Sequence, residues 1–375
     1  MNFLYRFMGL HKARQLMKTK TYSITVNVTN GTYVGAEEIT TGEIAQISIA
    51  PSDGYINPET ITVAGADYTW DAHSGIIELS NPTDDVVITV VCEVEPLPTP
   101  ESLEQASWAD IKRLSDAGQG ANYFAVGDTK SIALNGTVGT LELNNYETYV
   151  YIIDFNHNSA VEGTGISFGF FKSAGSNGAD IALCDSHYGR SSTNGSKWFN
   201  MNHGGSTSAR GWKGCDLRYD ILGSVETKDQ QDATSAAVSN PVANTLMAAL
   251  PSDLRAVIKP ITKWTDNVGT AAPAEINVTA TVDYLPLLAE YEIFGSRTYA
   301  NDAEQSHQAQ YAYYNGISAT QRKKYNHSNI NRAVYYLERS FAAYNSGCFC
   351  CVAEDGSANY AASDTSVGLS PVFVV

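Results

Sequence analysis

The chain has 375 residues, of which 43% are hydrophobic and only 17% are charged, a composition that favours globular domains over a disordered chain. Its net charge is −16, and residues 21–110 contain 15 Asp and Glu but neither Lys nor Arg. This acidity disfavours nucleic acid and anionic lipid as ligands. No run approaches the roughly 18 apolar residues of a membrane span, and the first ten residues, interrupted by Arg6, are not expected to be a signal peptide.

Residues 1–20 carry five basic residues and no acidic one. Their apolar residues recur near helical spacing, which predicts a short amphipathic helix. These apolar residues are Phe3, Leu4, Phe7 and Leu10. We expect the segment to dock on a partner protein by burying this apolar side, and the alternatives are a disordered tail and contact with a membrane surface.

Residues 21–94 show the short alternating patterns of a β-sandwich. Strands are expected at intervals of about ten residues, because turn residues separate runs in which hydrophobic and polar side chains alternate. The expected strands are Tyr22–Val28, Ile44–Ile49, Thr60–Val63, Gly75–Leu79 and Asp85–Val91. Asn30 and Gly31 predict a hairpin turn after the first strand. The whole segment resembles the small immunoglobulin-like repeats of bacterial surface and phage proteins, which implies a spacer.

Residues 95–101 contain three prolines and predict an extended linker between two domains. The domain that follows, residues 102–375, combines helices with strands. A helix is expected at 107–114, with Ser107 as its N-cap, and a helix pair broken at Pro251 is expected at 244–255. The expected strands are 130–134, 148–155, 166–171, 278–282, 334–337, 348–352 and 371–375. The chain is therefore expected to be multidomain and mainly β.

A series of segments in the second domain follows a recognisable order. Among them are SWADIKRLSDAG (107–118), FAVGDTKSIAL (124–134), GWKGCDLRYDILG (211–223), YLPLLAEYEIFG (284–295) and FCCVAEDGSANY (349–360). Through them the domain resembles an uncharacterised domain of Firmicutes and their phages, whose closing pattern is similar to C-type-lectin-like folds. The resemblance implies an α+β C-type-lectin-like head in which the last strands are framework and the loops between them bind ligand.

The sequence departs from that family at two places. Glu338 is inserted where the family tends to have two aromatic residues followed by Leu, Arg and Ser. The last strand has Leu369, Ser370 and Pro371 where Val-Arg-Pro is usual. A structural arginine of the family is therefore expected to be missing near the last strand.

Residues 341–365 are the best candidate for a ligand-facing region. Tyrosine offers a large contact area at small entropic cost, while serine and asparagine adapt their hydrogen bonds to the ligand. The predicted ligand-binding residues are Tyr344, Asn345, Ser346, Asp355, Asn359, Tyr360, Ser363 and Asp364. The alternative is an ordinary polar loop. A separate hypothesis is that a retroelement diversifies the codons of this region, which would give Asn, Tyr, Ser, Asp and Cys at such sites.

The six cysteines follow no recognisable disulfide pattern. Cys348 and Cys350 would share one face of a strand and Cys351 would lie on the other, so they are expected to be buried free thiols rather than metal ligands. A second set is too loosely spaced for a standard zinc finger: Cys184, His187, His203 and Cys215. We therefore expect no metal and no cofactor. The sequence also lacks the common nucleophile, zinc-protease and phosphate-loop motifs, which disfavours an enzyme.

Together these features predict a bacteriophage virion protein, a tail or head fibre exposed on the particle surface that attaches to the bacterial host. The N-terminal segment would dock on other virion proteins, and the head would bind a surface glycan or protein. The alternatives are a structural capsid-decoration or tail-completion protein and, less favoured, a tail-associated cell-wall or polysaccharide hydrolase. A homo-oligomer is compatible with this role, although no coiled-coil heptads are present to drive one.

Overall fold

The computed structural model describes residues 19–174, 178–270 and 272–375. Within these ranges the protein is mainly β, with several sheets and few short helices. The chain divides into two compact units between Pro96 and Leu97. None of the helices in the described part of the chain is long and apolar enough to cross a membrane. The predicted docking residues lie outside the described residues: Phe3, Leu4, Phe7 and Leu10.

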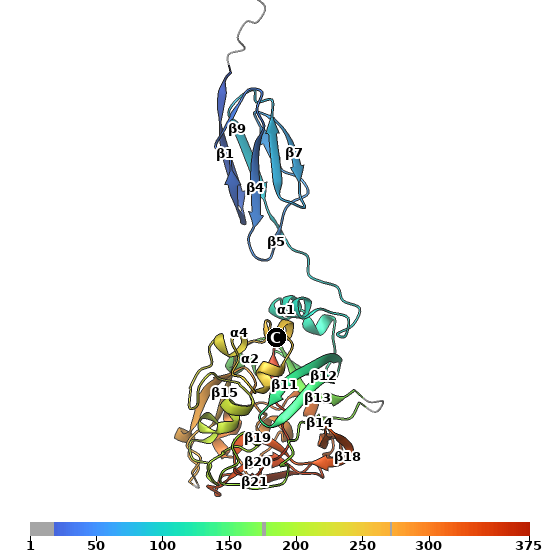
Figure 1. Cartoon of the computed structure of the whole chain (residues 1–375), viewed down its shortest axis with the longest axis vertical. Helices are drawn as coiled ribbons and strands as arrows, with labels where there is room; N and C mark the ends of the chain where they lie inside the picture. Colours follow the sequence, from blue (N-terminus) through green and yellow to red (C-terminus); the bar gives the residue numbers. More distant parts are fainter. Residues whose placement is uncertain (1–18, 175–177, 271) are drawn as a thin grey trace, which may run out of the picture. The chain divides into compact units, whose positions relative to one another are not determined.

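The N-terminal unit contains two four-stranded sheets and a two-stranded ribbon (Figure 1). Its strands are β1 (Thr21–Thr29), β2 (Gly31–Gly35), β3 (Glu38–Thr40), β4 (Ala45–Pro51), β5 (Tyr55–Ile56), β6 (Thr62–Ala64), β7 (Asp67–Asp71), β8 (Ile76–Ser80), β9 (Val86–Val91) and β10 (Glu93–Val94). One sheet has the order β3-β1-β9-β6 and the other β2-β4-β8-β7, while β10 pairs with β5. Strands β1 and β9 run parallel. Each of the five strands predicted from the sequence overlaps a strand of the structure, and β2, β3, β5, β7 and β10 are additional.

One hydrophobic core lies between the two sheets of this unit. Side chains alternate between buried and exposed along β4, β8 and β9, because successive residues of a strand point to opposite faces. The side chains of Ile77, Leu79, Val86, Ile88 and Val90 have no exposed surface. Burying each of them stabilises the fold by about 1.5–3 kcal/mol, so the alternation seen in the sequence is what holds the sheets together.

The hairpin predicted at Asn30 and Gly31 is wrong. Asn30 does adopt a left-handed conformation, with φ of 60°, but β1 and β2 belong to different sheets. The carbonyl of Asn30 accepts a hydrogen bond from the backbone N–H of Ser52 at 2.9 Å, so the turn carries the chain from one sheet to the other. The dipeptide predicts the left-handed conformation of Asn30 correctly but cannot specify which strand pairs with which.

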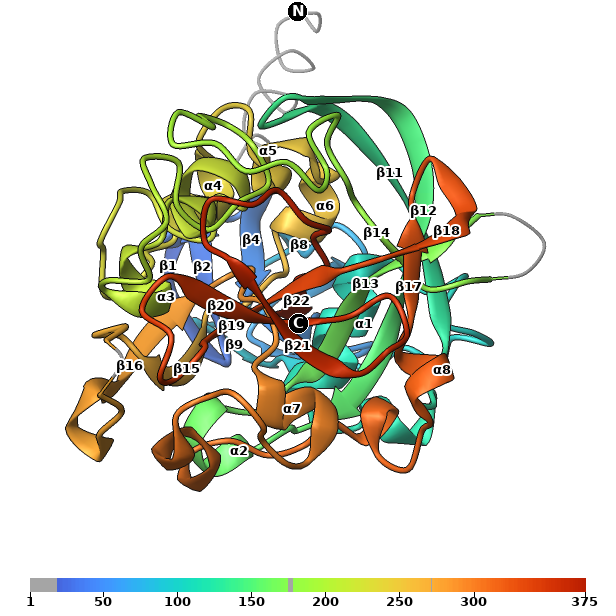
Figure 2. The same ribbon diagram turned by 90° about the horizontal axis from the view of Figure 1, so that it is seen from below.

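The C-terminal unit contains four sheets. Its strands are β11 (Thr129–Val138), β12 (Leu141–Phe155), β13 (Ile166–Ser173), β14 (Ile181–Ala182), β15 (Ile261–Asp266), β16 (Val278–Asp283), β17 (Lys324–Asn326), β18 (Asn329–Val334), β19 (Tyr336–Phe341), β20 (Cys348–Val352), β21 (Ala358–Ala362) and β22 (Val372–Val374). The largest sheet has the order β11-β12-β13-β22, and the others are β14-β17-β18, β15-β16 and β19-β20-β21. Figure 2 looks onto β20 and β21, which lie in the foreground of this unit. Every strand predicted for residues 102–375 overlaps one of these strands.

The helices of the C-terminal unit are short. They are α1 (Trp108–Asp116), α2 (Ser159–Glu162), α3 (Gly211–Gly214), α4 (Ala236–Ser239), α5 (Leu246–Ala249), α6 (Ser252–Arg255), α7 (Glu290–Phe294) and α8 (Ala319–Arg322), with single turns at η1 (Gly120–Asn122), η2 (Leu217–Ile221, a π-helical turn), η3 (Glu275–Asn277), η4 (Asp302–Ser306) and η5 (Ala312–Tyr314). Ser107 caps α1 as predicted, because its side chain accepts a hydrogen bond from the Asp110 N–H at 3.1 Å. Pro251 separates α5 from α6, which confirms the predicted helix pair.

An aromatic cluster packs α1 onto the largest sheet. The ring of Trp108 meets that of Phe168 edge-on at 5.6 Å, and Phe168 stacks on Phe373 of β22 at 5.0 Å. At the position where the resembled family tends to have an arginine, the hydroxyl of Ser370 is buried and donates to the carbonyl of Phe170. The last strand is therefore anchored by ring packing and main-chain pairing with β13 rather than by an arginine at this position.

Candidate functional site

An open groove of about 400 Å³ lies on the C-terminal unit beside β21. Segments far apart in the sequence line it: residues 188–189, the strand β18 and the region from 354 to 367. Its aromatic, charged and amide side chains are Tyr188, Arg332, Tyr335, Glu354, Asn359 and Tyr360. Aromatic faces combined with a few hydrogen-bonding and charged groups are typical of binding sites.

The tyrosines of the groove are fixed by contacts within the protein. The N–H of Tyr335 donates to the hydroxyl oxygen of Tyr188 at 2.8 Å, and the guanidinium of Arg332 lies 4.8 Å from the ring centroid of Tyr188, a cation–π contact. Burial raises the pKa of both Tyr188 and Tyr335, so both phenols are neutral near pH 7. Tyr360 meets the ring of Tyr299 edge-on at 5.1 Å. The groove thus offers preoriented rings together with one cation.

Part of the predicted ligand-binding set lies at this groove. Asn359 and Tyr360 line it, and Tyr360 is 42% exposed. Tyr344 is 74% exposed, and Ser346 and Asp355 are at least partly exposed, but none of these three is among the residues that line the groove. The structure therefore brings together two of the predicted residues and leaves three others on the surface outside the groove.

Ser363 and Asp364 are buried, so in this conformation they do not face a ligand at the surface as predicted. The carbonyl of Ser363 accepts a hydrogen bond from the N–H of Asn202 at 2.9 Å, and Asn345, which is partly buried, donates its N–H to the carbonyl of Ala342 at 3.0 Å. These residues hold neighbouring loops together. Small polar residues serve both roles, so the sequence pattern could not separate them.

Of the six aromatic, charged and amide side chains of the groove, sequence reasoning missed four: Tyr188, Arg332, Tyr335 and Glu354. Glu354 lies inside the predicted region but was not selected from it. The other three come from segments that precede the region, and only the three-dimensional fold brings them beside β21. The single sequence signal that points to them is the general richness in tyrosine, 22 residues in all.

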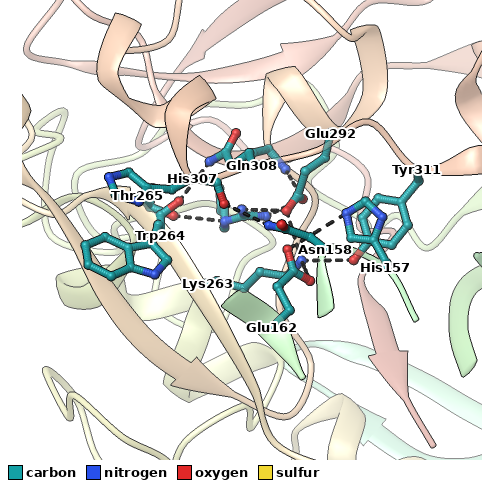
Figure 3. A network of polar contacts seen from close by, with 12 residues as sticks. His157, Asn158, Glu162, Lys263, Trp264, Thr265, Glu292, His307, Gln308 and Tyr311 are labelled. Carbon is teal, nitrogen blue, oxygen red and sulfur yellow. Dashed lines mark hydrogen bonds and ion pairs between the residues drawn. The ribbon is translucent and has the colours of Figure 1, made fainter. Parts of the chain in front are cut away.

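A second polar constellation is a buried ion network in the C-terminal unit (Figure 3). The ammonium of Lys263 on β15 donates to Glu162 at 2.5 Å, to Glu292 at 2.9 Å and to the hydroxyl of Tyr311 at 2.9 Å. Arg339 on β19 donates from two nitrogens to the two carboxylate oxygens of Glu292. The side chains of Lys263, Glu292 and Arg339 have no exposed surface, so the network joins β15, α7 and β19 in the interior.

Histidine 157 lies at the edge of this network. The ring of His157 stacks on Tyr311 at 3.5 Å, and its Nδ1 lies 2.9 Å from Asp154. Burial alone would raise the pKa of Glu292, but the charges of Arg339 and Lys263 outweigh it and the pKa is lowered. Acidic and basic side chains that pair with one another in the interior indicate a structural role, and we assign none of these residues to a reaction.

Two glutamates near the ion network, Glu338 and Glu304, have raised rather than lowered pKa values. Both carboxylate oxygens of Glu338 are buried without a hydrogen-bond partner, and burial, reinforced by the charges of Glu290 and Glu304, raises the pKa of Glu338 well above its ordinary value. Burial also raises the pKa of Glu304 to about 7. This part of the interior therefore holds carboxyl groups that keep their protons to higher pH than ordinary glutamates do.

The cysteines are all free, and five of the six are buried. Burial raises the pKa of Cys184 and of Cys215 to about 12, so both are unreactive thiols near pH 7. Cys184 and Cys215 lie in different hydrophobic clusters and, among the residues that the structure describes, no cysteine belongs to a group of converging metal ligands. The loose zinc set considered from the sequence does not form.

Glu354 is the one carboxylate among the described residues that line the groove. No protein-family model matches the chain, and comparison with curated proteins and with solved structures finds no match either. A function can therefore be proposed only from the site itself.

Proposed function

We propose that the chain is a bacteriophage virion protein, a tail or head fibre that attaches to the bacterial host surface by non-covalent recognition through the groove. The observation that carries this proposal is the groove itself, which places three tyrosines, one arginine and one asparagine around an open volume of about 400 Å³. Such side chains bind by ring stacking and hydrogen bonding and do not require a reaction.

The identities of the two units are part of the proposal. Two facing four-stranded sheets with a shared core suit an immunoglobulin-like spacer. The C-terminal unit suits a C-type-lectin-like head of the uncharacterised Firmicutes and phage domain, and the groove in part uses the loops that this resemblance assigns to ligand. The basic segment 1–20 would dock on other virion proteins. Several copies on one particle would raise avidity, so each groove can bind weakly.

Competition for adsorption tests this function. Purified full-length protein is added to host bacteria before the phage, and unadsorbed particles are counted. The proposal predicts that free protein slows adsorption in a dose-dependent manner and that Tyr360→Ala, which removes an exposed ring of the groove, weakens the effect. Undiminished adsorption at saturating concentrations of a folded protein would refute a role in attachment.

A capsid-decoration or tail-completion protein is the second candidate. The ion network favours this candidate, because buried ion pairs that join β15, α7 and β19 suit a part of a particle that is under mechanical stress. Particles assembled without the protein would then lose stability to heat or dilution, while adsorption by the surviving particles would be normal. Attachment predicts the opposite pattern, with stable particles that adsorb poorly.

A further inference from the structure

Three side chains with metal-binding atoms converge in the C-terminal unit, away from the ion network. They belong to His203, Asp216 and Asp220, and their ligand atoms all lie within 4.8 Å of one another. Asp216 and Asp220 are four residues apart at the π-helical turn η2, a spacing that places two side chains on one face. His203 comes from the glycine-rich loop that precedes α3.

One oxygen of each carboxylate is directed at His203. The Oδ2 atom of Asp220 lies 3.3 Å from the Nδ1 atom of His203, and the Oδ2 atom of Asp216 accepts the backbone N–H of His203 at 2.8 Å. The side chain of His203 is nine-tenths buried, with 10% of its surface exposed. Its Nε2 atom is buried and has no hydrogen-bond partner, so the ring is desolvated yet incompletely satisfied, which is unusual for a buried polar group.

The other oxygen of each carboxylate is taken by a lysine. Lys197 lies 3.2 Å from Oδ1 of Asp220, and Lys228 contacts Oδ1 of Asp216. Both lysines are partly exposed, at 38% and 47% of their side-chain surface. They hold the Oδ1 atoms, while Oδ2 of Asp220 faces the imidazole and Oδ2 of Asp216 contacts the backbone N–H of His203. Outer partners of metal ligands commonly orient them in this way.

The other converging group of this kind shares the unpartnered imidazole nitrogen but differs in the place of its cation. His157, Glu162 and Glu292 also bring ligand atoms within 4.8 Å of one another, and Nε2 of His157 also lacks a hydrogen-bond partner. There the fully buried ammonium of Lys263 lies between the two glutamates and donates to both, so a cation of the protein already fills the space. At His203 each lysine contacts the Oδ1 atom of a single aspartate and is partly exposed.

We propose that His203, Asp216 and Asp220 bind a divalent transition-metal ion of the zinc class. One imidazole nitrogen and two carboxylate oxygens are ligands that Zn²⁺ takes at about 2.0–2.2 Å, so small side-chain movements would complete the site. Three protein ligands leave a coordination position for water. Calcium is disfavoured because it requires six to eight oxygen ligands.

A bound ion would stabilise the loop next to the proposed recognition surface. The N–H of Ser208, in the same loop as His203, donates to the carbonyl of Ser346 at 2.8 Å, and the N–H of Asn202 donates to the carbonyl of Ser363 at 2.9 Å. The loop that carries His203 therefore supports both ends of the segment 346–363. The relevance of this loop to recognition rests on the proposed function, whereas metal binding itself can be tested independently of that function.

The experiment is a titration of metal-free full-length protein with Zn²⁺ against a chromogenic chelator, with Co²⁺ as a spectroscopic probe. We expect one Zn²⁺ per chain, and a Co²⁺ spectrum without the thiolate-to-metal charge-transfer band that cysteine ligands would give. His203→Ala and Asp220→Asn should each weaken binding at least ~10-fold, the least that loss of even an outer partner costs. Asp220→Asn keeps the side-chain size and so guards against misfolding of the histidine variant.

One variant serves as a control. His187→Ala removes a partly exposed histidine that stacks on Trp198 and lies 3.8 Å from Asp185, outside the cluster, and should leave Zn²⁺ binding unchanged. Absence of stoichiometric binding, a thiolate band with Co²⁺, or equal affinity of Asp220→Asn and wild type would each overturn the proposal.

Discussion

The carboxyl group of Glu304 makes the stability of the C-terminal unit depend on pH near neutrality. Its side chain is buried, accepts the Asp266 N–H at 2.9 Å and contacts the hydroxyl of Ser340 at 2.5 Å, yet burial still raises its pKa to about 7. Replacing it with glutamine removes the titration while keeping a neutral group of the same shape. We therefore predict that the difference in free energy of unfolding between Glu304→Gln and wild type changes with pH.

The sign and size of the change follow from the two states. The pKa of Glu304 is about 7 in the folded protein against an ordinary value of 4.5, so the folded state holds its proton longer than the unfolded state. Its stabilising contribution is fully present below pH 4.5 and is lost as the pH rises through 7. The two pKa values differ by about 2.5, which corresponds to roughly 3 kcal/mol because each pKa unit represents about 1.36 kcal/mol. Glu304→Gln should therefore gain about 3 kcal/mol relative to wild type between pH 4.5 and 8.

The assay is denaturant unfolding of both proteins at several pH values between 4.5 and 8, followed by tryptophan fluorescence. Burial lowers the pKa of His327 to about 4, so its titration makes the free energy of unfolding of each protein rise with pH up to about 6.5. This contribution is common to both proteins, and the difference in free energy of unfolding between variant and wild type removes it. Constant contributions from altered hydrogen bonds also cancel in the slope. A difference that changes by less than about 1 kcal/mol over this range would refute the reasoning, since the folded and unfolded pKa values of Glu304 would then differ by less than about one.

Two further substitutions test what holds the C-terminal unit together. Lys263→Ala removes the ammonium from between Glu162 and Glu292 and should lower the free energy of unfolding by about 3–5 kcal/mol. The control Lys112→Ala breaks an exposed pair with Asp116 and should lower it by about 1 kcal/mol or less. Equal losses in denaturant unfolding would contradict a structural role for the network. Ser107→Ala removes the N-cap of α1 and should cost about 1 kcal/mol. Ser107→Thr keeps the capping oxygen and the hydroxyl that donates to Asp110 and should be close to wild type in the same assay; an equal loss in both variants would show that the loss does not come from capping.

The periodicity of hydrophobic residues was a sufficient guide to most strands. The pattern of Tyr22–Val28 and Asp85–Val91 predicted β1 and β9, and the strand predicted at 348–352 coincides with β20 (Cys348–Val352). The periodicity could not predict which strands pair. The parallel pair of β1 and β9 joins segments some sixty residues apart, and this pairing depends on the shared core rather than on local sequence pattern. The hairpin at Asn30 failed for the same reason.

The candidate site was predictable only in part. The richness of residues 341–365 in tyrosine and asparagine led to Asn359 and Tyr360, which do line the groove. Arg332 and Tyr188 were not predicted, because a groove formed by distant segments leaves no local signature. The ion network was missed as well. Lys and Glu are usually exposed, and the sequence does not show that Lys263 and Glu292 pair with each other in the interior.

Equilibrium binding of the full-length protein to intact host bacteria tests the central claim most directly. Wild type is compared with the double variant Arg332→Ala/Tyr360→Ala, which removes the cation and the exposed ring of the groove, and with Tyr123→Ala, which removes a comparably exposed tyrosine of the C-terminal unit (37% exposed) outside it. Recognition through the groove predicts saturable binding by wild type and Tyr123→Ala and a loss of at least about 10-fold in affinity for the double variant, since each removed contact contributes on the order of 1 kcal/mol or more. Equal binding by all three proteins, or no binding by any of them while folded, would contradict it.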